Sequence, residues 1–106
     1  MPREDQPNVL PLEGEIDLHV SPNIAASLQM MIEKKPAQLI VDLARVTYID
    51  SSGLAALIEG MQNAQEYGGN FALTSLQEPV RTIFEIARLD QVFRIFPDVG
   101  AALAAA

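Results

Sequence analysis

Short apolar runs along the chain alternate with longer stretches in which apolar residues recur every three or four positions. The short runs, at residues 9–12, 39–41, 71–73 and 93–96, predict β-strands. The run at 39–41 is apolar without a break, which is typical of a strand covered on both faces. Pro11 interrupts the first run and cannot donate a ladder hydrogen bond, so we expect that strand to lie at an edge of the sheet or to be irregular.

Four helices are predicted between and after these strands. The first begins at Ser21, a hydroxyl cap, followed by Pro22 in the first turn. The second follows a polar turn and stops at the glycine pair 68–69. The third opens at Pro79, and Asp98 caps a short fourth helix. The apolar positions expected to face the core are Ile24, Leu28, Met31, Ile32, Leu54, Leu57, Ile58, Met61, Ala64, Val80, Ile83, Phe84 and Ala87.

The order of these elements predicts the fold class. Alternating strands and helices indicate an α/β fold: a small mixed or partly parallel sheet, about four helices packed against it, and right-handed crossovers. A chain of 106 residues is long enough for one core, so we expect a single domain over residues 1–106. Residues 1–8 are polar, include two prolines and are expected to form a loose end.

Composition narrows the function classes. The net charge of −7 disfavours binding to nucleic acids, whose phosphates require Lys and Arg, and binding to an anionic membrane surface. It favours encounter with a basic patch on another protein. Without cysteine, the chain has no disulfide and no zinc–thiolate site. No apolar run approaches the roughly 20 residues needed to span a bilayer, and the first residues lack a signal pattern, so we expect a cytoplasmic protein.

The polar turn before the second helix is the candidate site. Asp50, Ser51, Ser52 and Gly53 lie there between a strand-like apolar run and an apolar-striped helix. Such residues are common at helix starts, where Ser51 or Ser52 can cap the free N–H groups. However, loops at the carboxyl ends of strands are also where α/β proteins meet ligands and partners.

Three kinds of chemistry are conceivable at this turn. A hydrolase using Ser51 as nucleophile would need a base, and His19 is the only histidine; Ile49 also stands where a nucleophile elbow has glycine. Asp17 and Asp50 could hold Mg²⁺ with water, although aspartates in turns commonly form local hydrogen bonds. A third reading is that another protein modifies Ser51. A phosphoserine brings a charge of about −1.5 to −2, which a helix N-terminus tolerates and a docked partner does not.

Three segments together resemble the STAS domain of bacterial anti-sigma factor antagonists. The match runs from residue 9 onward and includes the glycine pair at 68–69 and the strand after it. The segments that carry the resemblance are Gly14-Glu15-Ile16-Asp17, Leu39-Ile40-Val41-Asp42-Leu43 and Tyr48-Ile49-Asp50-Ser51-Ser52-Gly53-Leu54. The family usually has a full strand before the first of these segments, where this chain has only a short polar stretch. The resemblance therefore implies a first strand that is missing, short or irregular.

The resemblance implies a partner-switching module. The unphosphorylated antagonist would bind an anti-sigma factor that is also a serine kinase, freeing a sigma factor; phosphorylation of Ser51 would release it, and a serine phosphatase would reset it. Asp17, Asp50, Ser52 and Gly53 would contribute to the partner-binding surface. The antagonist is the substrate, so we expect no catalytic residue, metal or cofactor, and the oligomeric state stays open between monomer and weak dimer. The alternative is a STAS regulatory subunit of a membrane lipid or anion transporter, docking on its ATPase.

Overall fold

The structure, a computed structural model, describes residues 8–105. Within them, four strands form one sheet in the order β1-β2-β3-β4, and each neighbouring pair is parallel. The elements are β1 (Val9–Ile16), α1 (Ser21–Ile32), β2 (Gln38–Ile49), α2 (Ser51–Glu66), β3 (Asn70–Thr74), α3 (Glu78–Ile86), the 3₁₀ helix η1 (Leu89–Gln91), β4 (Arg94–Phe96) and α4 (Val99–Ala104). The predicted α/β class is confirmed, and the sheet in this part of the chain is wholly parallel rather than mixed.

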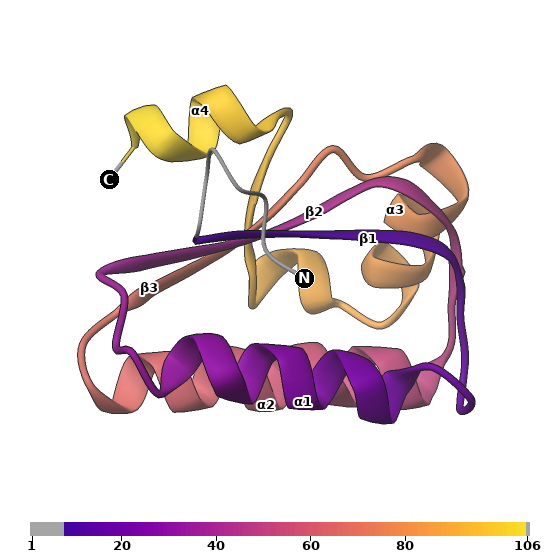
Figure 1. Ribbon diagram of the computed structural model, residues 1–106. Coiled ribbons are helices and arrows are strands. Elements are labelled where there is room, and N and C mark those ends of the chain that lie inside the picture. Colours follow the sequence, from indigo (N-terminus) through magenta and orange to yellow (C-terminus); the bar gives the residue numbers. More distant parts are fainter. Residues whose placement is uncertain (1–7, 106) are drawn as a thin grey trace.

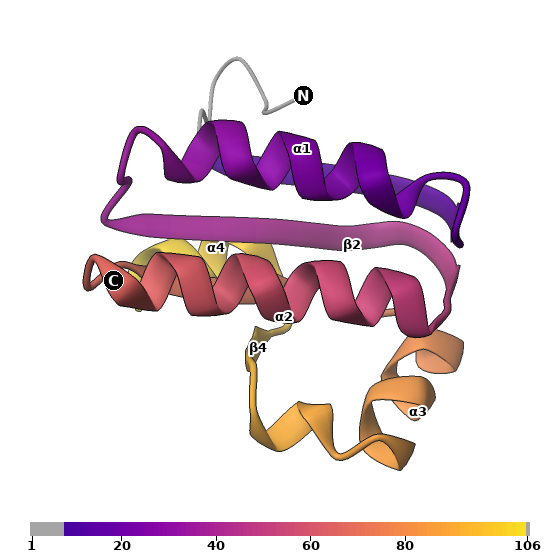
Figure 2. The same cartoon turned by 90° about the horizontal axis from the view of Figure 1, so that it is seen from below.

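The helices cover the sheet on two sides. α1 and α2 pack side by side against one face, whereas α4 lies against the opposite face (Figures 1 and 2). α3 packs against β2, and the Gln77 side chain just before it donates a hydrogen bond to the Ala44 carbonyl oxygen, at 2.7 Å. Because α1, α2 and the segment with α3 and η1 each connect two parallel neighbours, the chain builds the sheet one strand at a time.

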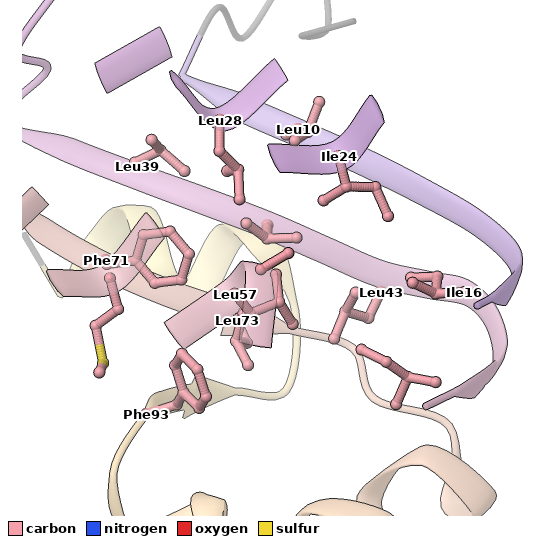
Figure 3. Packing of buried hydrophobic residues seen from close by; sticks show 14 of the residues in the cluster. Leu10, Ile16, Ile24, Leu28, Leu39, Leu43, Leu57, Phe71, Leu73 and Phe93 are labelled. Atoms are coloured by element: carbon pink, nitrogen blue, oxygen red, sulfur yellow. The ribbon is translucent and has the colours of Figure 1, made fainter. Parts of the chain in front are cut away.

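β2 is the strand that both layers bury. Leu39 and Val41 belong to the larger hydrophobic cluster beneath α1 and α2, part of which is drawn in Figure 3. Ile40 points to the other face, where it packs with Val9 and Ala72 beneath α4. All three residues of the run 39–41 are fully buried, so the prediction of a strand covered on both faces is confirmed.

The predicted core positions on the helices are largely confirmed. Ala87 is exposed because it lies just after the last turn of α3, and Leu54, Ile58 and Ile83 are half-buried. The remaining positions are buried: Ile24, Leu28, Met31, Ile32, Leu57, Met61, Ala64, Val80 and Phe84. Burying a side chain of this size contributes about 1.5–3 kcal/mol, so this set accounts for much of the packing of the helices on the sheet.

Two predicted helix ends are confirmed and one is wrong. The N–H groups of Gly68 and Gly69 donate to the carbonyl oxygens of Gln65 and Ala64, which closes α2 in a Schellman motif with φ of +82° at Gly68. The Asp98 carboxylate caps α4 by accepting from the Ala101 N–H at 2.7 Å. Ser21, however, is no cap. It is the buried first residue of α1, and Val20, whose side chain cannot accept a hydrogen bond, stands at the cap position.

Within residues 8–105, β1 forms one edge of the sheet, and its pairing with β2 is irregular directly after Pro11, as the proline predicted. β2 is longer than the predicted run at 39–41 and continues without interruption to Ile49. Its pairing with β1 shifts register twice, and each shift places an extra β2 residue opposite β1. Polar and apolar residues do not alternate strictly in the second half of β2. The two β-bulges nevertheless allow Val46 and Ile49 to point into the core.

The first residues of the chain are expected to form a loose end, and no membrane-spanning segment is expected. Residues 1–7 of the predicted loose end lie outside the described residues, whereas the Asn8 carbonyl oxygen accepts a hydrogen bond from the Ile40 N–H at 2.9 Å. The resemblance implies that a first strand before β1 is missing, short or irregular, and this part of the chain also lies outside the described residues. Over residues 8–105, no helix is both long enough and apolar enough to cross a membrane.

Candidate functional site

The carboxyl ends of β1 and β2 meet at one edge of the sheet. Ile16 and Ile49 are paired neighbours, and the Asp50 N–H donates to the Ile16 carbonyl oxygen at 3.0 Å. Asp17 and Asp50 therefore follow directly from adjacent strand ends. The loop after β1 and the turn before α2 lie side by side, as the sequence predicted from the position of the two aspartates.

Asp50 organises the turn. It has extended backbone geometry, and one carboxylate oxygen, Oδ1, accepts three hydrogen bonds: from the Ser52 N–H at 2.9 Å, from the Gly53 N–H at 3.1 Å and from the Ser52 hydroxyl at 2.6 Å. Asp50 is thus the cap of α2, which corrects the prediction that Ser51 or Ser52 caps this helix. All these residue types cap helices well, and here the helix begins one residue earlier than a serine cap would require.

The same contacts set the charge state of Asp50. The Ser52 hydroxyl, the Gly53 N–H and the Ser52 N–H all stabilise the carboxylate form, and together they outweigh partial burial. The pKa of Asp50 is consequently held below its usual range. The turn carries a full negative charge at neutral pH directly beside Ser51.

The two hydroxyls have different environments. Ser51 is the first residue of α2 and is exposed, and within the described part of the chain its side chain makes no hydrogen bond. Ser52 is half-buried, and its hydroxyl is held by Asp50. A reagent or an enzyme that approaches from solvent therefore meets Ser51 Oγ first, while Ser52 supports the turn.

Gly53 has an interior role. It is buried where α2 crosses the ends of β1 and β2, and a Cβ at this position would lie 2.6 Å from Ile16 Cγ2 and 2.7 Å from Ile49 Cγ1. Only glycine allows so close an approach. The structure therefore gives Gly53 a packing role, and its direct contact with a partner stays a prediction.

The loop after β1 presents an apolar side chain beside the turn. Asp17 holds this loop: its Oδ1 accepts from the His19 N–H at 2.9 Å, and its carbonyl oxygen accepts from the N–H groups of Val20 and Ser21. Leu18 between them is 72% exposed, the second most exposed of the large hydrophobic residues of the described chain after Ile86. Sequence reasoning missed Leu18; the available signal was an isolated leucine outside every apolar stripe.

Among the described residues, the turn offers neither a cluster of metal ligands nor a cavity lined by the predicted site residues. Over residues 8–105, no group of three or more His, Asp or Glu side chains is placed to hold a metal ion. Asp17 and Asp50 each use a carboxylate oxygen to hold their own loop. A cavity of about 370 Å³ lies further back along the sheet, lined by Pro11, Leu12, Glu13, Asp42, Ala44 and Arg45, and includes none of the predicted site residues. The candidate site is thus an exposed hydroxyl on an acidic turn that hydrogen bonds hold in place.

Comparison with known proteins decides the family. Residues 1–102 match the STAS domain. This chain belongs to the STAS-domain family. An anti-sigma-B factor antagonist from Bacillus subtilis is 30% identical over 84 residues, which cover 79% of this STAS domain and 76% of that protein.

Solved structures give the same fold. The crystal structure of an anti-sigma factor antagonist from Mycobacterium paratuberculosis superposes with a TM-score of 0.83 at 26% identity, covering 92% of this STAS domain and 82% of that chain. The crystal structure of a sulfate transporter family protein from Wolinella succinogenes superposes with a TM-score of 0.81 at 22% identity, covering 92% of this STAS domain and 82% of that chain. At that identity the second likeness shows the shared fold alone.

Proposed function

We propose that this STAS domain is an anti-sigma factor antagonist that works by partner switching, with Ser51 as its phosphorylation site. The observation that carries the proposal is the exposed Ser51 hydroxyl, which makes no hydrogen bond within residues 8–105 and lies on a turn beside two aspartates. The relatives named as anti-sigma factor antagonists support the same role. The unphosphorylated domain would bind an anti-sigma factor and thereby free a sigma factor.

In the proposed reaction this chain is the substrate. The partner, a serine kinase, transfers the γ-phosphoryl group of ATP to Ser51 Oγ; a P–O bond to the β-phosphate breaks, ADP leaves, and the hydroxyl proton passes to a base on the kinase. The domain supplies only the hydroxyl and its position. Its role is therefore regulatory rather than enzymatic, and we place it in the cytoplasm with its kinase and a serine phosphatase that resets it.

Charge explains how one phosphate would release the partner. The new group adds about −1.5 to −2 charges next to Asp50, whose carboxylate is ionised, and near the Asp17 loop. A partner surface that complements these acids would face a larger charge to desolvate, and any acid of its own would be repelled. Like charges brought together at an interface cost several kcal/mol, and each 1.4 kcal/mol lowers affinity tenfold.

Phosphorylation in vitro tests the site. The domain is incubated with ATP and the cognate kinase, and mass spectrometry measures the incorporated phosphate. We expect one phosphate at Ser51, none on Ser51→Ala, and near-parent incorporation on the matched variant Ser52→Ala. Equal incorporation into Ser51→Ala and the parent would show that another residue is the acceptor.

Partner binding tests the switch. We expect Ser51→Asp to weaken binding to the anti-sigma factor while its circular dichroism spectrum stays that of the parent. Unchanged affinity in a calorimetric titration would count against release by charge. The transporter alternative shares the fold with the Wolinella protein, and co-purification with an ATP-binding transporter subunit instead of a kinase would favour it.

A further inference from the structure

One carboxylate oxygen occupies three donors that lie close to Ser51. Asp50 Oδ1 accepts the N–H groups of Ser52 and Gly53, two amides in the first turn of α2 that have no partner within the helix, and also the Ser52 hydroxyl. Phosphate groups near a helix N-terminus are normally drawn to such amides, because their N–H groups are unpaired and carry partial positive charge. Here they are already paired.

The turn has little room to rearrange. The Asp50 N–H is fixed to the Ile16 carbonyl oxygen, so the backbone before the helix is attached to β1. Gly53 lies against Ile16 and Ile49, so the first turn of α2 cannot retreat into the core. For a phosphate on Ser51 to reach the amides, the Asp50 side chain itself would have to leave all three of its donors.

We propose that Asp50 acts as a spacer: by keeping the Ser52 and Gly53 amides and the Ser52 hydroxyl, it holds a phosphate on Ser51 out at the surface instead of letting it settle over the helix N-terminus. This inference rests on the proposed function, in which Ser51 carries a phosphate. Its consequence is that the phosphate keeps its charge available to repel a partner and its oxygens accessible to a phosphatase. Asp50 is a positioning residue in this role.

The test uses the full chain with phosphoserine installed at position 51 by genetic encoding, so that no kinase is needed. Proton–nitrogen NMR follows the Ser52 and Gly53 amides from pH 5 to 8, the range in which a phosphoserine loses its second proton. In the parent, we expect both amide signals to stay close to their positions in the unphosphorylated protein. Downfield shifts that follow phosphate ionisation would mean that the phosphate has taken the amides, and would overturn the proposal.

Two variants of the phosphorylated protein sharpen this result. Asp50→Ala leaves the amides unpaired, so there we expect both signals to shift with phosphate ionisation. Asp50→Asn retains a capping oxygen without charge, so its amides should stay as in the parent. In this variant the second pKa of the phosphate, read by phosphorus NMR, should fall by about half a unit, the effect of removing one charge roughly 6 Å away through water. An unchanged phosphate pKa would place Asp50 too far away to act.

Other ionisable groups near the turn need a control. Asp17 and His19 lie in the adjacent loop, and His19 is the only histidine of the chain. The titration is therefore repeated with His19→Gln, and the amide result should be the same; amide shifts that disappear with the histidine would point to His19 and not to the phosphate. Failure of the spacer would leave phosphorylation of Ser51 intact, whereas failure of a kinase to modify Ser51 would leave these NMR results unchanged.

Discussion

Replacing Gly53 by alanine should destabilise the whole domain, because the first turn of α2 is seated directly on two strand ends. The added Cβ would lie 2.6 Å from Ile16 Cγ2 and 2.7 Å from Ile49 Cγ1. Ordinary carbon contacts begin at about 3.5 Å, so the overlap is about 0.9 Å. Ile16 and Ile49 are each 1% exposed and would have to shift to make room. Overpacking of this kind costs about 1–3 kcal/mol, and alanine recovers less than about 1 kcal/mol from its better helix propensity.

Urea unfolding followed by circular dichroism measures this effect. We expect Gly53→Ala to lose about 1–2 kcal/mol of unfolding free energy, which lowers Tm by about 5–10 °C for a domain of this size. Gly100→Ala is the matched control: Gly100 is an exposed helical glycine, and its added Cβ meets its nearest atom, Asp98 Oδ1, only at 3.4 Å. That variant should be as stable as the parent or slightly more. Equal midpoints for Gly53→Ala and the parent would refute the argument from close packing.

Three further predictions concern the turn and the loop beside it. Ser52→Ala should lower the unfolding free energy by about 1 kcal/mol because Asp50 loses its hydroxyl donor, whereas Ser51→Ala should change it by less than about 0.5 kcal/mol; urea titrations of both decide. The lowered pKa of Asp50 means that its carboxylate stabilises the fold above its unfolded pKa of about 3.9, and that this stabilisation disappears as the pH falls through the folded pKa. The Tm difference between parent and Asp50→Asn should therefore change in favour of Asp50→Asn as the pH falls below about 4, and a constant difference would contradict this. Finally, Leu18→Ala should weaken binding of the anti-sigma factor about tenfold, while Met30→Ala, equally apolar and 68% exposed at the far end of α1, should not; equal effects would exclude Leu18 as an anchor.

The fold was largely predictable because its signals are local. The stripe of apolar residues on α2 and the glycine pair that ends it define the helix without reference to the rest of the chain. The buried run at 39–41 likewise indicates a strand with two covered faces. The full length of β2 was not predictable, because its second half alternates irregularly. That pattern makes sense only with two bulges opposite β1, and pairing between distant strands leaves no local signal.

The position of the candidate site was predictable from the sequence, but the hydrogen bonds within it were not. Asp50, Ser51 and Ser52 are all good capping residues, so sequence alone does not say which one begins the helix. The answer depends on β1, since the Asp50 N–H is bound to the Ile16 carbonyl oxygen and this contact sets where the helix starts. The division of roles between an exposed Ser51 and a bound Ser52 follows from that one-residue choice.

The rigidity of the turn also bears on how a switch here would be read. The turn before α2 is held from three directions: by the Ile16 carbonyl oxygen, by the Asp50 cap and by the packing of Gly53 on the strand ends. A phosphate added to Ser51 meets a backbone that these contacts hold in place. Under the proposed function, its effect must therefore be carried by surface charge and not by refolding of the domain. A partner would then sense the phosphate only if it contacts the turn itself, which is why the neighbouring Asp17 loop and its exposed Leu18 belong to the same proposed surface.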